Sequence, residues 1–400
     1  MELSATYRYL SPAIRVYAGD GSLSQISSEV RRLGATRCFV VCSETVSKTT
    51  NLLERVKTQL GDACVGIYAN AKRESPIPLV MEGVRQAREI NPDCIVAVGG
   101  GSAVITARAI TILLAENGTP EELCTKYPPG QPPQSPRLEK PKLPQIVVLT
   151  TPTNGVHRGG AAVMDDKPPY RLELFDPKSR PTSIILDGEA LLTAPVSLFL
   201  DTTITTFAGL IDSVQSSNMN PFSSADNRQA LEICVKYLPD LVNNPDDSTP
   251  RIQLAAASIL VNRASDAPSS TAQAGGVTTS MDREIRYTHP HIGQGGSRLL
   301  MSLATMRRNK EILKEGLIEL GQIFGVPSST MSEDQATSST IEAVEDFIKS
   351  IGVPIRLRDM DVPEDSLLGI AERDSVRPSY LEGSRRISNV EDLLLLLKEV

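Results

Sequence analysis

The chain has 400 residues, of which 40% are hydrophobic and 22% are charged. This is the composition of a soluble globular protein, and the length favours two domains over one. A formal net charge of -7 without a basic stripe argues against nucleic acid as the main partner, and no apolar run reaches membrane-spanning length.

The sequence also bears on the compartment. Its first residues, MELSATYRYL, lack the basic and then apolar pattern of a secretory signal. The six cysteines contain no CxxC pair, and Cys38, Cys42 and Cys94 fall in strand-like runs, where buried and reduced thiols are expected. We therefore expect a cytoplasmic protein.

The first 190 residues alternate between strand and helix patterns. Ser22 is placed to cap a helix whose apolar residues, from Leu23 to Leu33, recur at helical spacing. This alternation predicts a doubly wound parallel sheet, which binds ligands at the carboxyl ends of its strands. The other predicted elements are strands at 37–44, 63–69, 94–100, 145–151 and 183–187, and helices at 46–60 and 79–90.

The sequence pattern changes twice further along the chain. Residues 117–144 hold eight of the chain's 28 prolines, which predicts an extended surface loop. After residue 190 only helical patterns recur. We expect an α/β domain of the nucleotide-binding type at 1–190 and an all-helical domain at 191–400. The predicted helices of the second domain lie at 196–218, 226–241, 252–264, 296–325, 340–350, 363–372 and 390–399.

A glycine-rich turn joins the predicted strand 94–100 to an apolar, helix-like run. It consists of Gly99, Gly100, Gly101 and Ser102. Glycines between a strand and a helix let backbone N–H groups approach an anion, and the N-terminus of the helix favours negative charge. The turn therefore predicts a phosphate cradle. It is not a GxGxxG fingerprint, and a tight turn without a ligand remains the alternative.

Several motifs resemble those of the iron-containing alcohol dehydrogenase family over nearly the whole chain. GGGSAVITAR (99–108) is similar to the family's nucleotide motif GGGSxxDxAK. The resemblance implies a dehydroquinate synthase-like fold, with a dinucleotide-binding domain, a C-terminal helical bundle and an active site in the cleft between them. Six further segments match family motifs in order: 17–23, 149–157, 175–195, 208–217, 288–301 and 351–372.

The family holds its metal with one Asp and three His residues. The resemblance places Asp212 at the first ligand position, Ser216 at the second, a residue near Val277 at the third and His291 at the fourth. Two hypotheses follow. Either the site is rebuilt from Asp212, His289 and His291, or the metal site is lost. We favour the second, because an open catalytic site normally needs three protein ligands and Ser and Val are poor ones.

The nucleotide motif also departs from the family pattern. Ile105 stands at its aspartate and Arg108 at its lysine, which weakens the case for tight nicotinamide binding. Ser43 stands where many members carry an Asp that bonds the adenosine ribose; Ser tolerates a 2′-phosphate, so NADP is no less expected than NAD. The implied cofactor site comprises Gly99, Gly100, Gly101, Ser102, Ser43, Thr150, Thr151 and Thr153.

Three functions are open at this stage. The first is a metal-independent NAD(P)H-dependent reductase of a carbonyl or an activated double bond, resembling maleylacetate reductases, with His291, His289 and Asp212 in the catalytic centre. The second is a non-redox enzyme, such as a cyclase, isomerase, dehydratase or pericyclase, that uses the cleft without cofactor or metal. The third, a non-catalytic relative, has no motif in its favour. The expected partner is a small molecule, neither nucleic acid nor membrane, and the chain could form a homodimer as family members often do.

His157 stands where the family motif at 149–157 ends in Glu. It could face the cleft, or it could be an ordinary loop residue. The pattern leaves both interpretations open.

Overall fold

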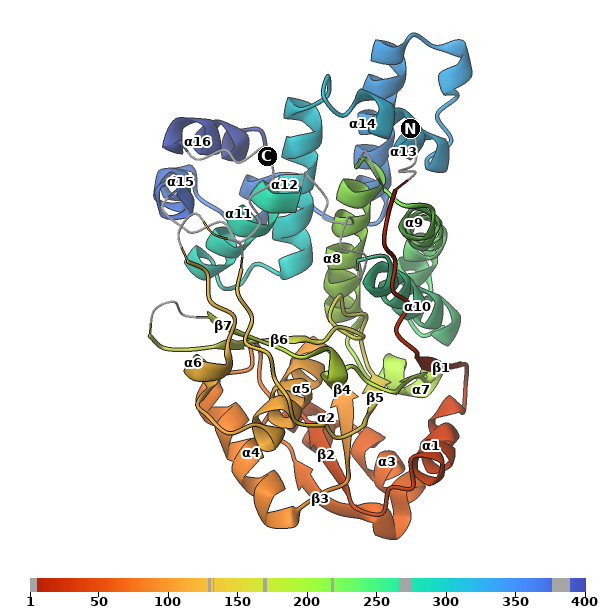
Figure 1. Ribbon diagram of the computed structural model, residues 1–400. Helices are drawn as coiled ribbons and strands as arrows, with labels where there is room; N and C mark the ends of the chain where they lie inside the picture. The colour runs from red at the N-terminus through yellow and green to blue at the C-terminus, as the bar shows by residue number, and fades with distance from the viewer. Residues whose placement is uncertain are drawn as a thin grey trace. The chain divides into compact units, whose positions relative to one another are not determined.

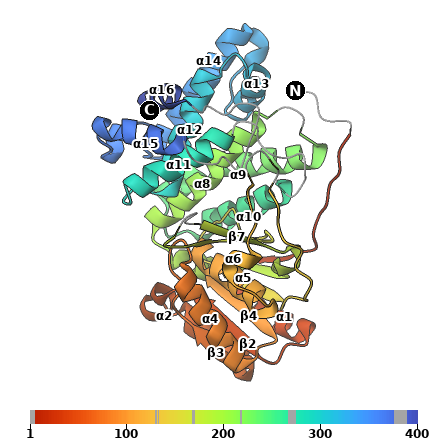
Figure 2. The same ribbon diagram turned by 60° about the vertical axis from the view of Figure 1, so that its left-hand side comes forward.

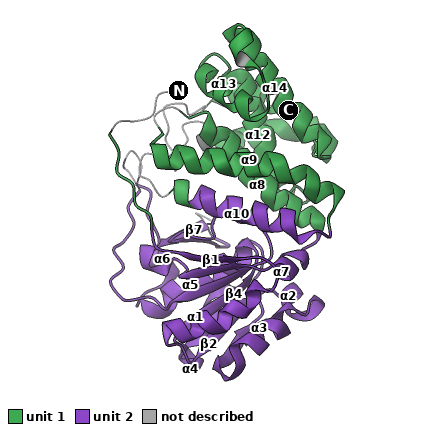
Figure 3. Ribbon diagram, turned by 90° about the vertical axis from the view of Figure 1, so that its right-hand side faces the viewer, with its two compact units in different colours: residues 1–11, 196–245, 263–400 green, residues 12–195, 246–262 purple. Residues whose placement is uncertain are grey.

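The computed structural model describes residues 6–128, 131, 133–167, 171–216, 219–265, 275–375 and 389–400. The chain divides into two compact units (Figure 3). The α/β unit comprises Pro12–Pro195 and Asp246–Asn262, and the helical unit comprises Met1–Ser11, Val196–Pro245 and Arg263–Val400. The main change of unit, after Pro195, lies close to the expected boundary at 190. The segment Asp246–Asn262 and the N-terminal residues belong to the other unit from the one expected.

The α/β unit is built on a six-stranded sheet in the order β1-β8-β5-β4-β2-β3, in which every neighbouring pair is parallel (Figure 1). The prediction of a doubly wound parallel sheet is thereby confirmed. Because all strands run the same way, their carboxyl ends share one edge of the sheet. The strands are β1 (Arg15–Ala18), β2 (Cys38–Cys42), β3 (Cys64–Tyr68), β4 (Cys94–Gly99), β5 (Gln145–Leu149) and β8 (Ser183–Leu186).

Helices cover both faces of this sheet (Figures 1 and 2). α1 and α3 bury Ile26 and Val56 against strand residues such as Val40 and Val96 in one apolar core. α4 and α5 lie on the opposite face. Since strand side chains alternate between faces, a sheet covered on both sides needs the continuous apolar runs that the sequence shows. The helices of this unit are α1 (Gln25–Leu33), α2 (Glu44–Thr49), α3 (Leu52–Leu60), α4 (Ile77–Ile90), α5 (Gly101–Ala115), α6 (Pro120–Leu123), α7 (Gly188–Leu192) and most of α10 (Ser248–Ala264).

Two local predictions in this unit were wrong. Ser22 does not cap α1: it opens a short 3-10 turn, Ser22–Ser24, which has no side-chain cap bond and is preceded by Gly21 at φ 75°. The helix expected at 46–60 is two helices, because Thr50 between α2 and α3 has an extended backbone and ends the first of them.

An antiparallel hairpin was not predicted. β6 (Gly160–Met164) pairs with β7 (Arg171–Phe175) apart from the main sheet. Each strand is only five residues long and alternates between buried and more exposed positions. Segments as short as GAAVM carry too little β-forming signal to be recognised singly.

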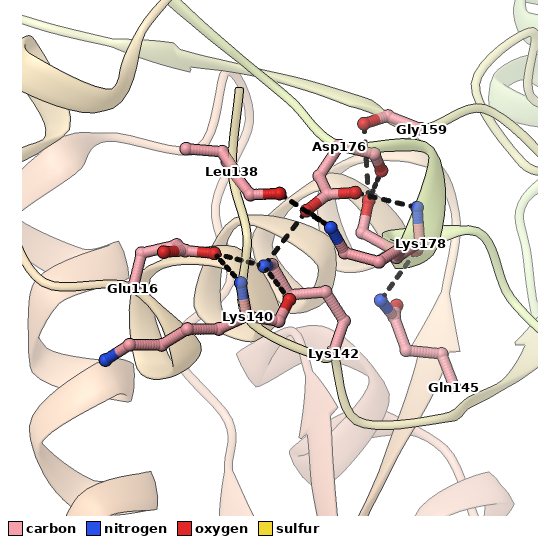
Figure 4. A network of polar contacts seen from close by, with 9 residues as sticks. Glu116, Leu138, Lys140, Lys142, Gln145, Gly159, Asp176 and Lys178 are labelled. Atoms are coloured by element: carbon pink, nitrogen blue, oxygen red, sulfur yellow. Dashed lines mark hydrogen bonds and ion pairs between the residues drawn. The ribbon is translucent and has the colours of Figure 1, made fainter. Parts of the chain in front are cut away.

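The proline-rich segment 117–144 is largely irregular where it is described, with the short helix α6 inside it. Lys142 anchors its end (Figure 4). The Lys142 side chain is fully buried, with its Nζ 2.6 Å from Glu116 and 2.9 Å from Asp176. Glu116 also accepts the backbone N–H of Lys140, and Lys178 donates to the Leu138 carbonyl. The loop is therefore fixed by buried charge rather than by an apolar core of its own.

The helical unit has α8 packed closely against α12. The expected helix at 296–325 is two helices separated at Asn309, and α11 was not predicted. Residues 217 and 218, at the end of the helix expected at 196–218, lie outside the described residues. No helix in the described part of the chain is long and apolar enough to cross a membrane. The helices are α8 (Val196–Val214), α9 (Pro221–Asn243), α11 (Gly275–Thr288), α12 (Gln294–Arg308), α13 (Lys314–Ile323), α14 (Glu333–Ser350), α15 (Leu367–Ser375) and α16 (Val390–Lys398).

Candidate functional site

The glycine-rich turn lies where the sequence placed it, at the carboxyl end of β4. Gly99 has φ 143°, a conformation that favours glycine, and Gly100 is the N-cap of α5 without any side-chain cap bond. The first backbone N–H groups of a helix have no partner inside it, so an uncapped N-terminus presents them to an anion.

Hydroxyl groups from the end of β5 pack directly against this turn. The backbone N–H of Thr150 donates to the Gly99 carbonyl at 3.2 Å. A Cβ at Gly100 would lie 2.5 Å from Thr151 Oγ1, and one at Gly101 would lie 3.1 Å from Thr153 Oγ1. The turn thus has no room for larger side chains, and the structure brings the three threonines and the glycines together.

Two other predicted cofactor residues, Ser43 and Ser102, lie at the same edge of the sheet, where the carboxyl ends of the strands meet. Ser43 follows β2, the strand beside β4, and its hydroxyl accepts the Val46 N–H at 3.2 Å as the cap of α2. Ser102 is in the first turn of α5, and its carbonyl accepts a hydrogen bond from Ser75. The loop after β2 and the turn after β4 are neighbours because their strands are paired.

Arg108 is fully buried and faces the loop after β5. Its guanidinium donates to the carbonyls of Gly155, Val156 and Gly160 at 2.8–2.9 Å. Burial lowers its pKa to about 9, with smaller contributions from Arg180 and Arg158. Arg108, the basic residue of the motif, therefore fixes the loop that follows β5.

His157 lies in that loop and is 3% exposed. Its backbone N–H donates to Asn262, its carbonyl accepts from Arg180, and its ring bonds the Ala13 backbone. Nε2 is buried and has no hydrogen-bond partner among the described residues. Burial, followed by the charges of Arg180 and Arg108, lowers the pKa of His157 to about 4, so the ring is neutral near pH 7. It is an anchored loop residue of the α/β unit.

His289 and His291 lie together in the helical unit, with ring centroids 5.9 Å apart. His289 Nε2 is 3.0 Å from the Ser366 hydroxyl, and His291 Nε2 is 3.1 Å from the Met360 carbonyl. Burial lowers the pKa of His289, and the charges of His291 and Arg373 add to this. His291 is exposed and His289 half-buried, which suits groups that exchange protons.

Asp212, the third predicted catalytic residue, lies in α8. Asp201, near the start of α8, accepts the N–H groups of Gly295 and Gly296 and so holds the segment that follows the histidines. Asp212 is buried eleven positions further along the same helix. At 1.5 Å per residue this is about 16 Å from Asp201 along the axis. Asp212 thus lies about three turns of α8 from the residue that holds this segment, and its grouping with the histidines stays a prediction.

Comparison with known proteins identifies the chain. The model of the iron-containing alcohol dehydrogenase family matches residues 12–188, and that of the family's C-terminal domain matches residues 200–399. The chain belongs to the iron-containing alcohol dehydrogenase family. The resemblance seen in the sequence motifs is confirmed. The NAD-dependent methanol dehydrogenase of Bacillus methanolicus is 24% identical over 390 residues, which are 95% of this chain and 96% of that relative.

Solved structures confirm the fold. An alcohol dehydrogenase from Oenococcus oeni superposes with a TM-score of 0.85 at 20% identity, over 98% of this chain and all of that one. A maleylacetate reductase from Rhizobium sp. strain MTP-10005 gives a TM-score of 0.77 at 18% identity, over 99% of this chain and 98% of that one.

The donor set does not fit the family's metal. Among the described residues, no group of three or more His, Cys, Asp or Glu side chains is arranged to hold a metal ion. Ser216, at the expected second ligand, donates its hydroxyl to the Asp212 carbonyl at 3.2 Å. The side chain of Val277, at the expected third, lies outside those described. A metal-free centre stays a prediction.

One residue near these motifs was missed. Arg298, in α12, lies against Gly209 of α8. Each residue alone is unremarkable in the sequence: a helical arginine and a helical glycine. Only the packing of α8 against α12 brings them together, so no local spacing could have indicated the pair.

Proposed function

We propose that this family member is a metal-independent NAD(P)H-dependent reductase of a carbonyl or an activated double bond in a small organic molecule. The observation that carries the proposal is the β4–α5 turn, where three glycines packed closely against Thr151 and Thr153 lead into a helix N-terminus without a side-chain cap. Relatives named as dehydrogenases and as maleylacetate reductases support redox chemistry. No observation favours the non-redox alternative.

The residues of the turn fit a dinucleotide. Gly99, Gly100, Gly101 and Ser102 would receive its pyrophosphate through backbone N–H groups. The hydroxyls of Thr151 and Thr153 would stand beside the same phosphates. Ser43, at the end of β2, carries no charge that would repel a 2′-phosphate, so NADP is accepted at least as well as NAD. When bound, the nicotinamide supplies a hydride.

The reaction also needs a proton. We assign its delivery to His291, which is exposed to solvent and held through one ring nitrogen by the Met360 carbonyl. His289 stands beside it and would hold or relay that proton. The participation of Asp212 stays a prediction. The proposal includes a cytoplasmic location, a small-molecule partner and a homodimer as the assembly to test.

The test is a fluorescence titration of the purified protein with NADPH and then NADH, with the metal content of the same sample measured. We expect micromolar binding of the nucleotide. We also expect the protein to reduce a carbonyl compound, and this activity should persist after exhaustive chelation of metals. If neither nucleotide binds, the turn is only a structural turn. If activity follows the metal content, metal independence is wrong while the reductase assignment stands.

A further inference from the structure

Arg298 projects from α12 toward α8 and is only half-buried. A Cβ at Gly209 would stand 3.3 Å from Nη2 of Arg298, so the missing side chain at Gly209 makes room for the guanidinium. The Nε atom is shielded from solvent, yet it donates to no acceptor in the part of the chain that the structure describes.

Two further polar atoms on the same face of α12 have no partner. Ser302 is fully buried and Thr305 is 6% exposed, and neither hydroxyl has a hydrogen-bond partner among the described residues. They follow Arg298 by four and seven positions. At 3.6 residues per turn these positions share one helix face. Three polar groups without partners among the described residues, those of Arg298, Ser302 and Thr305, thus lie along one face of α12, and the two hydroxyl groups are buried within the helical unit.

Burying polar groups without hydrogen-bond partners lowers the stability of the folded chain. A buried donor or acceptor without a partner loses its hydrogen bonds to water and gains none in return, and the cost is larger when the group is charged. Buried Arg108 also leaves its Nε without a partner among the described residues, but its two terminal nitrogens donate three hydrogen bonds to carbonyls. Arg298 has none of these. Unsatisfied groups in native proteins call for a ligand or water that supplies the missing partner.

We propose that Arg298, together with Ser302, binds a carboxylate group of the substrate. A guanidinium fork matches a carboxylate in geometry and charge, and the Ser302 hydroxyl, one helical turn further along, adds a donor. The inference rests on the proposed reductase function, because it defines the substrate class as a carbonyl compound that carries a carboxylate.

The experiment is calorimetric titration of the protein with succinate, with uncharged succinamide as the matched ligand. The wild-type protein binds succinate and not succinamide. R298Q weakens succinate binding at least tenfold, R298K weakens it less because it keeps the charge but not the fork, and S302A weakens it a few-fold. R358Q, which removes the same charge from an exposed arginine, leaves binding unchanged. If R298Q does not fold, R298K and S302A provide the comparison.

Inorganic phosphate and NADPH are titrated in parallel. Equal succinate binding by wild-type protein and R298Q overturns the proposal, as does the absence of succinate binding in a protein that binds NADPH. Tighter Arg298-dependent binding of phosphate than of succinate would overturn the carboxylate assignment. Arg298-dependent succinate binding without any NADPH binding supports the anion site and rejects the reductase instead.

Discussion

The ammonium group of Lys142 lies 2.9 Å from a carboxylate oxygen of Asp176, and solvent reaches neither side chain. Burial alone would raise the pKa of Asp176, but hydrogen bonds from the Lys178 backbone and from the Lys142 and Lys178 side chains hold it below the ordinary value. Glu116 completes the arrangement on the other side of Lys142. This network ties the proline-rich segment to α5 and to the chain after β7.

Replacing Lys142 leaves two buried carboxylates without their shared partner. Breaking a buried ion pair from one side costs about 3–5 kcal/mol. We expect Lys142→Met to lower the free energy of unfolding by this amount and to expose segment 117–144 to proteases. Urea unfolding and limited proteolysis measure the two effects. Lys140→Met is the control, since the Lys140 side chain is exposed and only its backbone joins the network. Equal losses in both variants would contradict the assigned role.

Gly100→Asp places a carboxylate at the uncapped end of α5, against Thr151. We expect NADPH affinity to fall at least a hundredfold, because the new charge repels the pyrophosphate and fills its space. Fluorescence titration measures the change. Gly369→Asp introduces the same charge in α15 and should bind NADPH normally. Retained affinity in Gly100→Asp would show that the nucleotide binds elsewhere.

Ser43→Asp tests coenzyme choice. Aspartate keeps the capping bond to Val46, because Asp caps helices as well as Ser does. Its charge should weaken NADPH binding about tenfold or more, while NADH binding changes little or improves. The ratio of the two dissociation constants is the measurement. An unchanged ratio would place the adenosine ribose away from the end of β2.

His291→Ala removes the proposed proton donor. We expect turnover to fall about a hundredfold or more, with NADPH affinity unchanged, because a general acid contributes on this scale to the chemical step. His289→Ala should lower turnover less, since it removes only the neighbouring ring. Steady-state kinetics at saturating coenzyme separates these effects from binding. Normal turnover in His291→Ala would remove this residue from the mechanism.

His157 predicts a dependence of stability on pH. Its pKa is lowered to about 4 in the folded chain from an ordinary 6.5. Between about pH 4 and 6.5 His157 is protonated in the unfolded chain but neutral in the folded chain. The free energy of unfolding therefore falls as the pH falls. The loss approaches about 3 kcal/mol near pH 4 and is absent above pH 7. In His157→Gln this part of the pH dependence should disappear, as measured by urea unfolding across that range. An unchanged slope would mean that the ring is not the group responsible.

The sheet was predictable because its signals are local. A strand covered on both faces must be apolar along its whole length, and the runs before Ser43 and Gly99 meet this condition. The helix α11 was missed because it begins with Gly275 and Gly276, which are poor helix formers, and β6 was missed because a short strand of Gly and Ala has little preference of its own. Both elements depend on tertiary packing, which a local pattern does not contain.

The candidate site divides in the same way. The glycine turn was recognised because its residues are consecutive. The pairing of Asp201 with Gly295, and of Arg298 with Gly209, joins segments far apart in the sequence. The grouping of Asp212 with the histidines stays a prediction. Their family positions were inferred one motif at a time.

The α/β unit includes Asp246–Asn262, which the chain reaches only after α8 and α9. Within this segment Arg251 donates to the carbonyls of Leu191 and Ala194, and Asn262 accepts the backbone N–H of His157. During synthesis, therefore, the N-terminal unit is complete only once residue 262 has left the ribosome, after residues 196–245 of the helical unit. A fragment that stops at Pro195 would lack these donors and acceptors. The two units are separate as structures, but the chain completes the first only after it has entered the second.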